Sequence, residues 1–67
     1  MTDTNRLKGK IIQKGLTSTQ LAEKLNMSKA TFSMKVNNKI KFSQNDIKNI
    51  VDILNLNDDE IRLFFLN

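Results

Sequence analysis

Cysteine, histidine and proline are absent from this chain, and glycine occurs only twice. Without cysteine the chain forms neither a disulfide bond nor a thiolate metal site, which agrees with a reducing cytoplasm. Without histidine it lacks the commonest general base and the commonest neutral metal ligand. It also contains no phosphate-cradling glycine-rich loop and no nucleophile elbow. We therefore predict a protein that is not an enzyme and that binds no metal and no cofactor.

Long apolar segments are missing as well. No apolar run approaches the roughly 20 residues that span a bilayer. The first ten residues, MTDTNRLKGK, lack the apolar core of a signal peptide. A chain of 67 residues forms one small domain, with no second domain to sense a small molecule. We expect a soluble cytoplasmic protein without a membrane partner or a small-molecule ligand.

The charge is distributed unevenly along the chain, whose net charge is +4. Residues 1–41 hold nine basic and two acidic side chains, a balance of +7. Residues 42–67 hold two basic and five acidic side chains, a balance of −3. The basic part favours a polyanion such as nucleic acid, although a lysine-rich solvated surface gives the same pattern. The acidic part indicates a different partner.

Regular apolar spacing and few helix breakers predict an all-α fold of five short helices. The first helix is expected at about 5–14, with Thr4 or Asn5 as its N-cap and Gly15 just beyond its end. Its apolar stripe consists of Leu7, Ile11 and Ile12. Gly9 within this helix costs about 1 kcal/mol relative to alanine, which indicates either a close neighbour or a locally weak helix.

The next segment predicts two helices joined by a tight turn. Thr17 and Gln20 form a T-x-x-Q capping box for a helix at about 18–25. Asn26 follows at the turn, because asparagine tolerates the left-handed conformation. Ser28 then caps a helix at about 29–36. The side chains expected to face inward are Leu21, Ala22, Leu25, Met27, Phe32 and Val36.

Two more capping pairs open the last helices. Ser43 with Asp46 precedes one apolar series, and Asn57 with Glu60 precedes another. The second series consists of Ile61, Leu63, Phe64, Phe65 and Leu66. These are more apolar side chains than one face of a short helix buries. We expect at least one phenylalanine in the core and another exposed at a dimer or partner interface. The alternative is that both rings close the core.

Residues 17–37 resemble the helix-turn-helix of the lambda-repressor/Cro type, often called the XRE family. The family pattern wants four apolar residues and one alanine where the helices cross. This chain supplies them as Leu21, Ala22, Leu25, Met27 and Phe32. It departs from the pattern at Asn26, where glycine is favoured, and at Lys35, where a bulky aliphatic is favoured. Val36 can take that core position instead. The resemblance implies a single lambda-repressor-like domain over residues 1–67.

The resemblance also implies a function. It predicts a sequence-specific DNA-binding transcriptional regulator, similar to the short Cro-like repressors of temperate phages. Such a protein acts in the bacterial cytoplasm and lies at the nucleoid when bound to an operator. By position, the base-contacting residues are Lys29, Ala30, Thr31, Ser33 and Met34. The phosphate-contacting residues are Ser18, Thr19, Asn37, Asn38, Lys39 and Lys41. Lys8 and Lys10 are expected to add only general electrostatic attraction, since the first helix lies farther from the bases.

Members of the resembled family usually bind double-stranded DNA as two-fold dimers on near-palindromic half-sites. The predicted dimer interface is the apolar series at the C-terminus, from Ile61 to Leu66.

A rival hypothesis is an anti-repressor that binds a phage repressor protein and has weak or no DNA binding alone. The predicted recognition helix has no Arg, Gln or Asn in its first two turns, so its capacity for bidentate base reading is poor. The acidic, apolar C-terminal part also suits a basic protein partner. In this hypothesis the residues that contact protein are Lys29, Thr31, Ser33, Met34 and Lys35.

Overall fold

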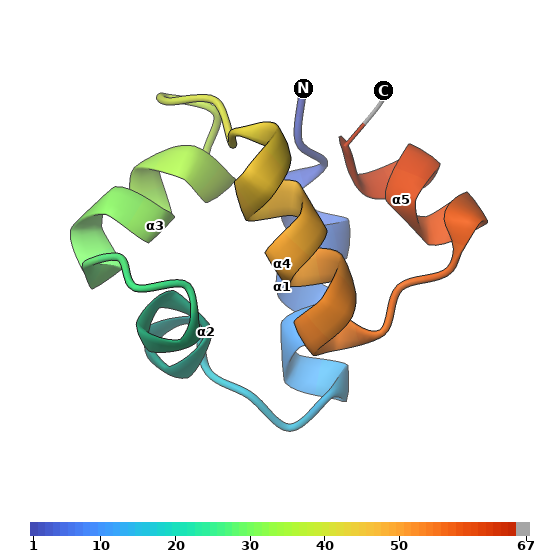
Figure 1. The fold of residues 1–67 in the computed structure, drawn as a ribbon, viewed down its shortest axis with the longest axis horizontal. Coiled ribbons are helices and arrows are strands. Elements are labelled where there is room, and N and C mark those ends of the chain that lie inside the picture. Colours follow the sequence, from blue (N-terminus) through green and yellow to red (C-terminus); the bar gives the residue numbers. More distant parts are fainter. Residues whose placement is uncertain (66–67) are drawn as a thin grey trace.

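The computed structural model describes residues 1–65, which form five helices and no strand (Figure 1). In chain order the helices are α1 (Thr4–Gln13), α2 (Ser18–Lys24), α3 (Lys29–Val36), α4 (Gln44–Leu54) and α5 (Asp58–Phe65). The predicted all-α fold of five helices is confirmed. In Figure 1, α1 and α4 run through the middle of the molecule, with α2 and α3 on one side and α5 on the other. Within the described residues, no helix has the length and apolar character that crossing a membrane requires.

Side-chain caps fix where the helices begin. The predicted caps Thr17, Ser28 and Ser43 each accept a hydrogen bond from the backbone N–H three residues later. At the start of α5, the N–H of Glu60 donates to Oδ1 of Asn57 at 2.8 Å, and the N–H of Asn57 donates to Oε1 of Glu60 at 3.1 Å. These four predictions are confirmed.

The first helix begins one residue earlier than predicted. Its N-cap is Asp3, so the expectation of Thr4 or Asn5 is wrong. Oδ1 of Asp3 accepts from the Arg6 N–H at 3.1 Å, and Oδ2 pairs with the Arg6 guanidinium at the same distance. A carboxylate that meets both a free N–H and a cation is the better cap. A Cβ added at Gly9 would meet no atom from outside its own stretch of helix within 4 Å, so of the two alternatives the close neighbour is ruled out.

A residue with a left-handed backbone conformation stands at the end of each of the helices α1 to α4. Gly15, Asn26, Asn38 and Asn55 have φ values of 75°, 57°, 65° and 53°. The predictions for Gly15 and Asn26 are thereby confirmed. Because glycine and asparagine tolerate positive φ, the helical hydrogen bonding stops there and the chain turns.

The core lies where the five helices converge. Its buried apolar residues are Leu7, Ile11, Leu21, Ala22, Phe32, Val36, Ile50, Leu54, Leu56, Phe64 and Phe65. Val36 is 3% exposed, as expected for the residue that replaces Lys35 in the core. Ile12, in contrast, is 74% exposed, so its predicted place in the apolar stripe is wrong. It lies about 100° around the helix from Ile11, which turns it away from the core.

Both phenylalanines of α5 are buried. Phe64 and Phe65 are each 6% exposed, so the expectation of an exposed ring is wrong and the alternative holds. Phe65 packs edge-on against Phe42, with ring centroids 6.0 Å apart. The interaction with Phe42, from the α3–α4 connection, supplies the burial that one face of α5 alone lacks. Leu66, the last residue of the predicted interface, lies outside the described residues.

Candidate nucleic-acid interface

The turn between α2 and α3 holds these two helices together. Leu21 and Ala22 of α2 and Phe32 of α3 are each at most 1% exposed. Within the turn, the N–H of Met27 donates to the carbonyl of Ala22 at 3.0 Å. The small Ala22 lets the two backbones approach, and the outer face of α3 is left open to solvent.

A cleft of about 160 Å³ lies beside this outer face. We call it the α3 cleft. It is lined by Lys8 of α1, Ser18 of α2, and Lys29, Phe32, Ser33, Val36 and Asn37 from α3 and its end. Two lysines that face one small hollow create a positive potential there, which attracts anions.

The five residues predicted to contact bases differ in how free their polar atoms are. Lys29, Ala30, Ser33 and Met34 are exposed, whereas Thr31 is half-buried. The hydroxyl of Ser28 donates to that of Thr31 at 3.0 Å, so Thr31 belongs to the cap of α3. Nδ2 of Asn37 donates to the carbonyl of Ser33 at 2.9 Å. Among the five, Lys29 therefore has the most accessible polar group.

The residues predicted to contact phosphate form a less uniform set. Thr19, Lys39 and Lys41 are exposed, and Ser18 is half-buried at the cleft. The side chain of Asn38, however, accepts from the N–H of Thr2 and donates to its carbonyl, both at 2.9 Å. These two bonds orient the amide of this exposed residue and leave one Nδ2 hydrogen unused, so a phosphate contact from Asn38 stays a prediction.

Residues 2–4 fasten α3 to α5. Besides the Thr2–Asn38 pair, the hydroxyl of Thr4 donates to the carbonyl of Val36 at 2.7 Å. The N–H of Asp3 donates to the carbonyl of Phe64 at 2.7 Å. We call residues 2–4 the N-terminal clamp. It holds the end of α3 in a fixed position relative to the core.

Ion pairs divide the cations of the basic half into two groups. Lys10 pairs with Glu60, and Nζ of Lys35 lies 2.6 Å from Oδ2 of Asp46. Within residues 1–65, four of the remaining lysines near α3 form no ion pair: Lys8, Lys29, Lys39 and Lys41. Sequence reasoning missed Lys8, because nothing within α1 distinguishes it from Lys10. Only the tertiary fold brings it to the cleft.

The two paired carboxylates have lowered pKa values. Burial raises the pKa of Asp46, but hydrogen bonds from Lys35 and from the backbone and side chain of Ser43 bring it below its usual value. The hydrogen bond from Lys10, followed by that from the Asn57 backbone, lowers the pKa of Glu60. Both groups therefore stay ionised at neutral pH and hold their lysines.

The sequence model of a family described as "Protein of unknown function (DUF739)" matches residues 1–67. The chain belongs to the DUF739 family. A comparison with curated proteins gave no match. The DUF739 match includes every residue of the α3 cleft and of the N-terminal clamp.

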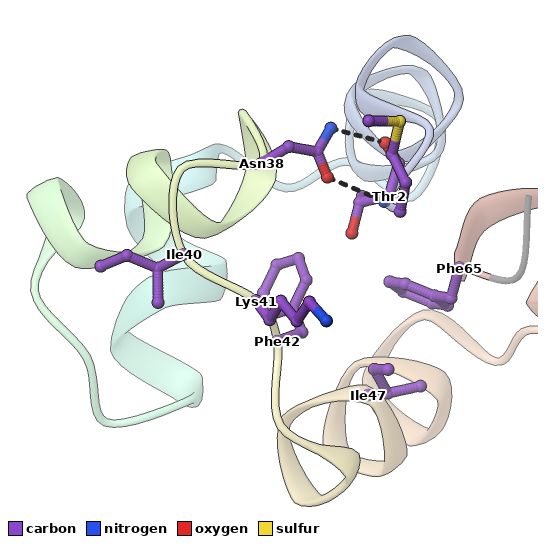
Figure 2. Close-up of a pocket in the computed structure, with 8 residues that line it drawn as sticks. Thr2, Asn38, Ile40, Lys41, Phe42, Ile47 and Phe65 are labelled. Carbon is purple, nitrogen blue, oxygen red and sulfur yellow. Dashed lines mark hydrogen bonds between the residues drawn. The ribbon is translucent and has the colours of Figure 1, made fainter.

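The DUF739 chain also has a second hollow, of about 320 Å³, which we call the 38–42 groove (Figure 2). It is lined by Met1, Thr2, Asn38, Ile40, Lys41, Phe42, Ile47 and Phe65. Figure 2 shows the Thr2–Asn38 hydrogen bonds at one edge and Phe42, Ile47 and Phe65 around the opening. The groove therefore combines an apolar interior with a polar edge.

Proposed function

We propose that this chain is a sequence-specific DNA-binding transcriptional regulator of the Cro-like helix-turn-helix type. In this function α3 enters the major groove, which is wide enough for one α-helix. One observation carries the proposal: the α3 cleft gathers Ser18, Lys29, Ser33 and Asn37, with Lys8, at an exposed surface. The first four of these are among the residues that the resemblance predicts to contact DNA.

Base reading rests mainly on the first turns of α3. Lys29 donates to guanine O6 and N7, and Ala30 and Met34 contact thymine methyl groups. Thr31 and Ser33 contribute less, because the Thr31 hydroxyl accepts a hydrogen bond from Ser28 and the Ser33 hydroxyl accepts one from Nδ2 of Asn37, at 3.4 Å. We therefore expect a short and rather permissive recognition sequence per subunit.

Phosphate binding rests on the unpaired lysines. Lys8, Lys39 and Lys41 neutralise backbone phosphates, with Ser18, Thr19 and Asn37 as polar contacts. Such contacts supply most of the affinity and fix the orientation of the protein on DNA. Asn38 also holds the end of α3 against the N-terminal clamp.

Two copies are proposed to bind the two halves of a near-palindromic operator. Since the rings of Phe64 and Phe65 are buried, the part of the predicted interface that remains on the surface is Ile61, which is half-buried, and Leu63, which is 41% exposed. These two side chains on α5 are the candidates for contact between subunits.

The test uses a duplex selected from a random DNA pool with the purified protein. Lys29→Ala should weaken binding to the selected duplex by about 1–3 kcal/mol and relax the preference at one base position. Lys24→Ala is the matched control, because Lys24 is an exposed lysine of α2 that lines neither the α3 cleft nor the 38–42 groove. Fluorescence anisotropy gives both affinities.

Two results would refute the proposal. One is a selection that yields no enriched sequence at low salt. The other is an equal loss of affinity in Lys29→Ala and Lys24→Ala, since general charge alone would then explain binding.

A second candidate function is modulation of a phage repressor protein, without strong DNA binding by this chain alone. The observation that favours it is the limited polar reach of α3, where the hydroxyls of Thr31 and Ser33 are already hydrogen-bonded. Lys35, one of the protein contacts that this hypothesis expects, is paired with Asp46. A mobility-shift titration with and without the repressor separates the two functions. Loss or supershift of the repressor complex, with no shift by this chain alone, supports the modulator.

A further inference from the structure

The interior of the 38–42 groove is apolar and held rigidly. The ring of Phe42 lies between those of Phe32 and Phe65, with centroid distances of 6.1 and 6.0 Å. Packing against both rings fixes Phe42 in one position. The groove is therefore preformed, and a side chain that enters it loses little free energy to reorganisation of the protein.

Exposed apolar side chains lie at the edge of this groove. Met1 is 82% exposed and Ile40 is 43% exposed, and both line it. Among residues 1–65 five large apolar side chains are exposed, and these are two of them. Apolar groups that cluster around a preformed hollow, rather than being scattered singly, mark an interaction site.

The charge of the groove has one sign. Lys41 lines it and forms no ion pair within residues 1–65, and no acidic side chain is among the lining residues. Asp46, which adjoins the lining residue Ile47, is already paired with Lys35. The groove therefore contains a cation, Lys41, that no carboxylate within residues 1–65 pairs with.

The backbone beside Lys41 offers further donors. In the described part of the chain, the N–H groups of Lys41 and Phe42 make no hydrogen bond, whereas that of Ile40 donates to the Met34 carbonyl at 3.3 Å. An extended segment of another protein can pair with such free groups while its side chains enter neighbouring pockets.

We propose that the 38–42 groove binds an acidic segment of another protein, with a bulky apolar side chain against Phe42 and Phe65 and a carboxylate beside Lys41. A second copy of this chain is a poorer occupant. Two-fold pairing of the grooves brings Lys41 of both copies to one interface, where like charges repel. The groove is distinct from the α3 cleft and this inference does not depend on DNA binding, but both proposals use Lys41, so an acidic segment and DNA phosphate would compete for it.

The test titrates the ¹⁵N-labelled full chain with a synthetic peptide that carries a central Leu-Phe pair flanked by aspartates. We expect amide shifts confined to residues around the groove, above all Ile40, Lys41 and Phe42. Fluorescence anisotropy of the labelled peptide should show about fivefold weaker binding for Lys41→Glu and about tenfold weaker binding for Ile40→Ser. Lys24→Glu, at an exposed site outside the groove, should bind as the unaltered chain does.

Two control peptides make the inference falsifiable. A peptide with the same aspartates and serines in place of Leu-Phe should not bind, and one with lysines in place of aspartates should bind at least about fivefold more weakly. Equal binding of the lysine peptide overturns the charge argument. Shifts at the groove that grow with protein concentration alone identify a dimer face, and no shift at millimolar peptide excludes the site; both results overturn the proposal. Circular dichroism of each variant checks that the helices are retained.

Discussion

At the scale of single residues, the two glycines stand in opposite backbone settings. Gly9 is helical, exposed and has open space where a Cβ would lie. Gly9→Ala should therefore raise the free energy of unfolding by about 1 kcal/mol, because alanine removes the entropic cost of glycine in a helix. Urea denaturation monitored by circular dichroism measures the change.

Gly15→Ala provides the contrasting variant. Gly15 also has open space around it, but its φ of +75° strains any side chain. This substitution should lower the free energy of unfolding by about 1 kcal/mol. If both variants stabilise the protein, the left-handed end of α1 is not what stops that helix.

Asn38 illustrates why a structural role can escape sequence reasoning. Its position after α3 and its polar amide both favour a phosphate contact. The structure shows this amide hydrogen-bonded to the backbone of Thr2, which lies 36 residues away in the chain. No local pattern reveals such a bond, since any residue supplies a backbone N–H and carbonyl.

At the scale of elements, the capped start of α4 couples to α3 through charge. Oδ2 of Asp46 accepts both the Ser43 N–H, at 3.0 Å, and the Lys35 ammonium, at 2.6 Å. Since the folded-state pKa of Asp46 is lowered from 3.8, its stabilising contribution is present above about pH 4 and is lost as pH falls through the folded value. Glu60, whose pKa is lowered from 4.5, acts in the same direction at the start of α5.

Asp46→Asn tests this coupling. Near neutral pH the variant should be less stable by about 1 kcal/mol, because Lys35 loses its partner while the amide can still cap α4. As pH falls below about 4, it should lose stability less steeply than the unaltered chain. Urea denaturation at constant ionic strength over this range measures both effects. Parallel pH curves for the two proteins would contradict the assigned role of Asp46.

The helices themselves could be predicted well, because their signals are local. A capping side chain and its N–H lie three residues apart, so Thr17, Ser28 and Ser43 were readable from the sequence. The error at α1 arose among three adjacent residues that can all cap. Pairing with Arg6 decided in favour of Asp3.

At the scale of the whole molecule, the proposed DNA surface depends on the sum of its lysines. The logarithm of the binding constant should fall linearly with the logarithm of salt, by about 0.9 for each phosphate neutralised. Lys8→Ala should make this slope shallower by about 0.9 per subunit, although sequence preference stays unchanged. Anisotropy titrations from about 50 to 200 mM salt give the slope.

Lys48→Ala is the control for that measurement. Lys48 is an exposed lysine of α4 that lines neither the α3 cleft nor the 38–42 groove. An unchanged slope in Lys48→Ala with a reduced slope in Lys8→Ala places the phosphates beside α1. Equal slopes in the two variants would remove Lys8 from the interface.

Molecule-wide packing decided the residues that sequence reasoning misjudged. Ile12 fits an apolar stripe in its own helix, yet no element covers it and it is 74% exposed. One of the two phenylalanines of α5 is expected to be exposed, yet both are buried, and Phe42 from a distant segment packs against Phe65. Local periodicity shows which side chains want burial, and only the arrangement of all five helices shows which of them obtain it.

The N-terminal clamp places two neighbouring amide hydrogens on two different junctions. The Thr2 hydrogen is held by Asn38 at the end of α3, and the Asp3 hydrogen is held by the Phe64 carbonyl in α5. The rate at which each hydrogen exchanges with deuterated solvent therefore measures how readily its own hydrogen bond opens. A ligand that loosens only the end of α3 speeds exchange at Thr2 and leaves Asp3 protected. The exchange rates of two adjacent residues thus report separately on the contacts made with the end of α3 and with α5.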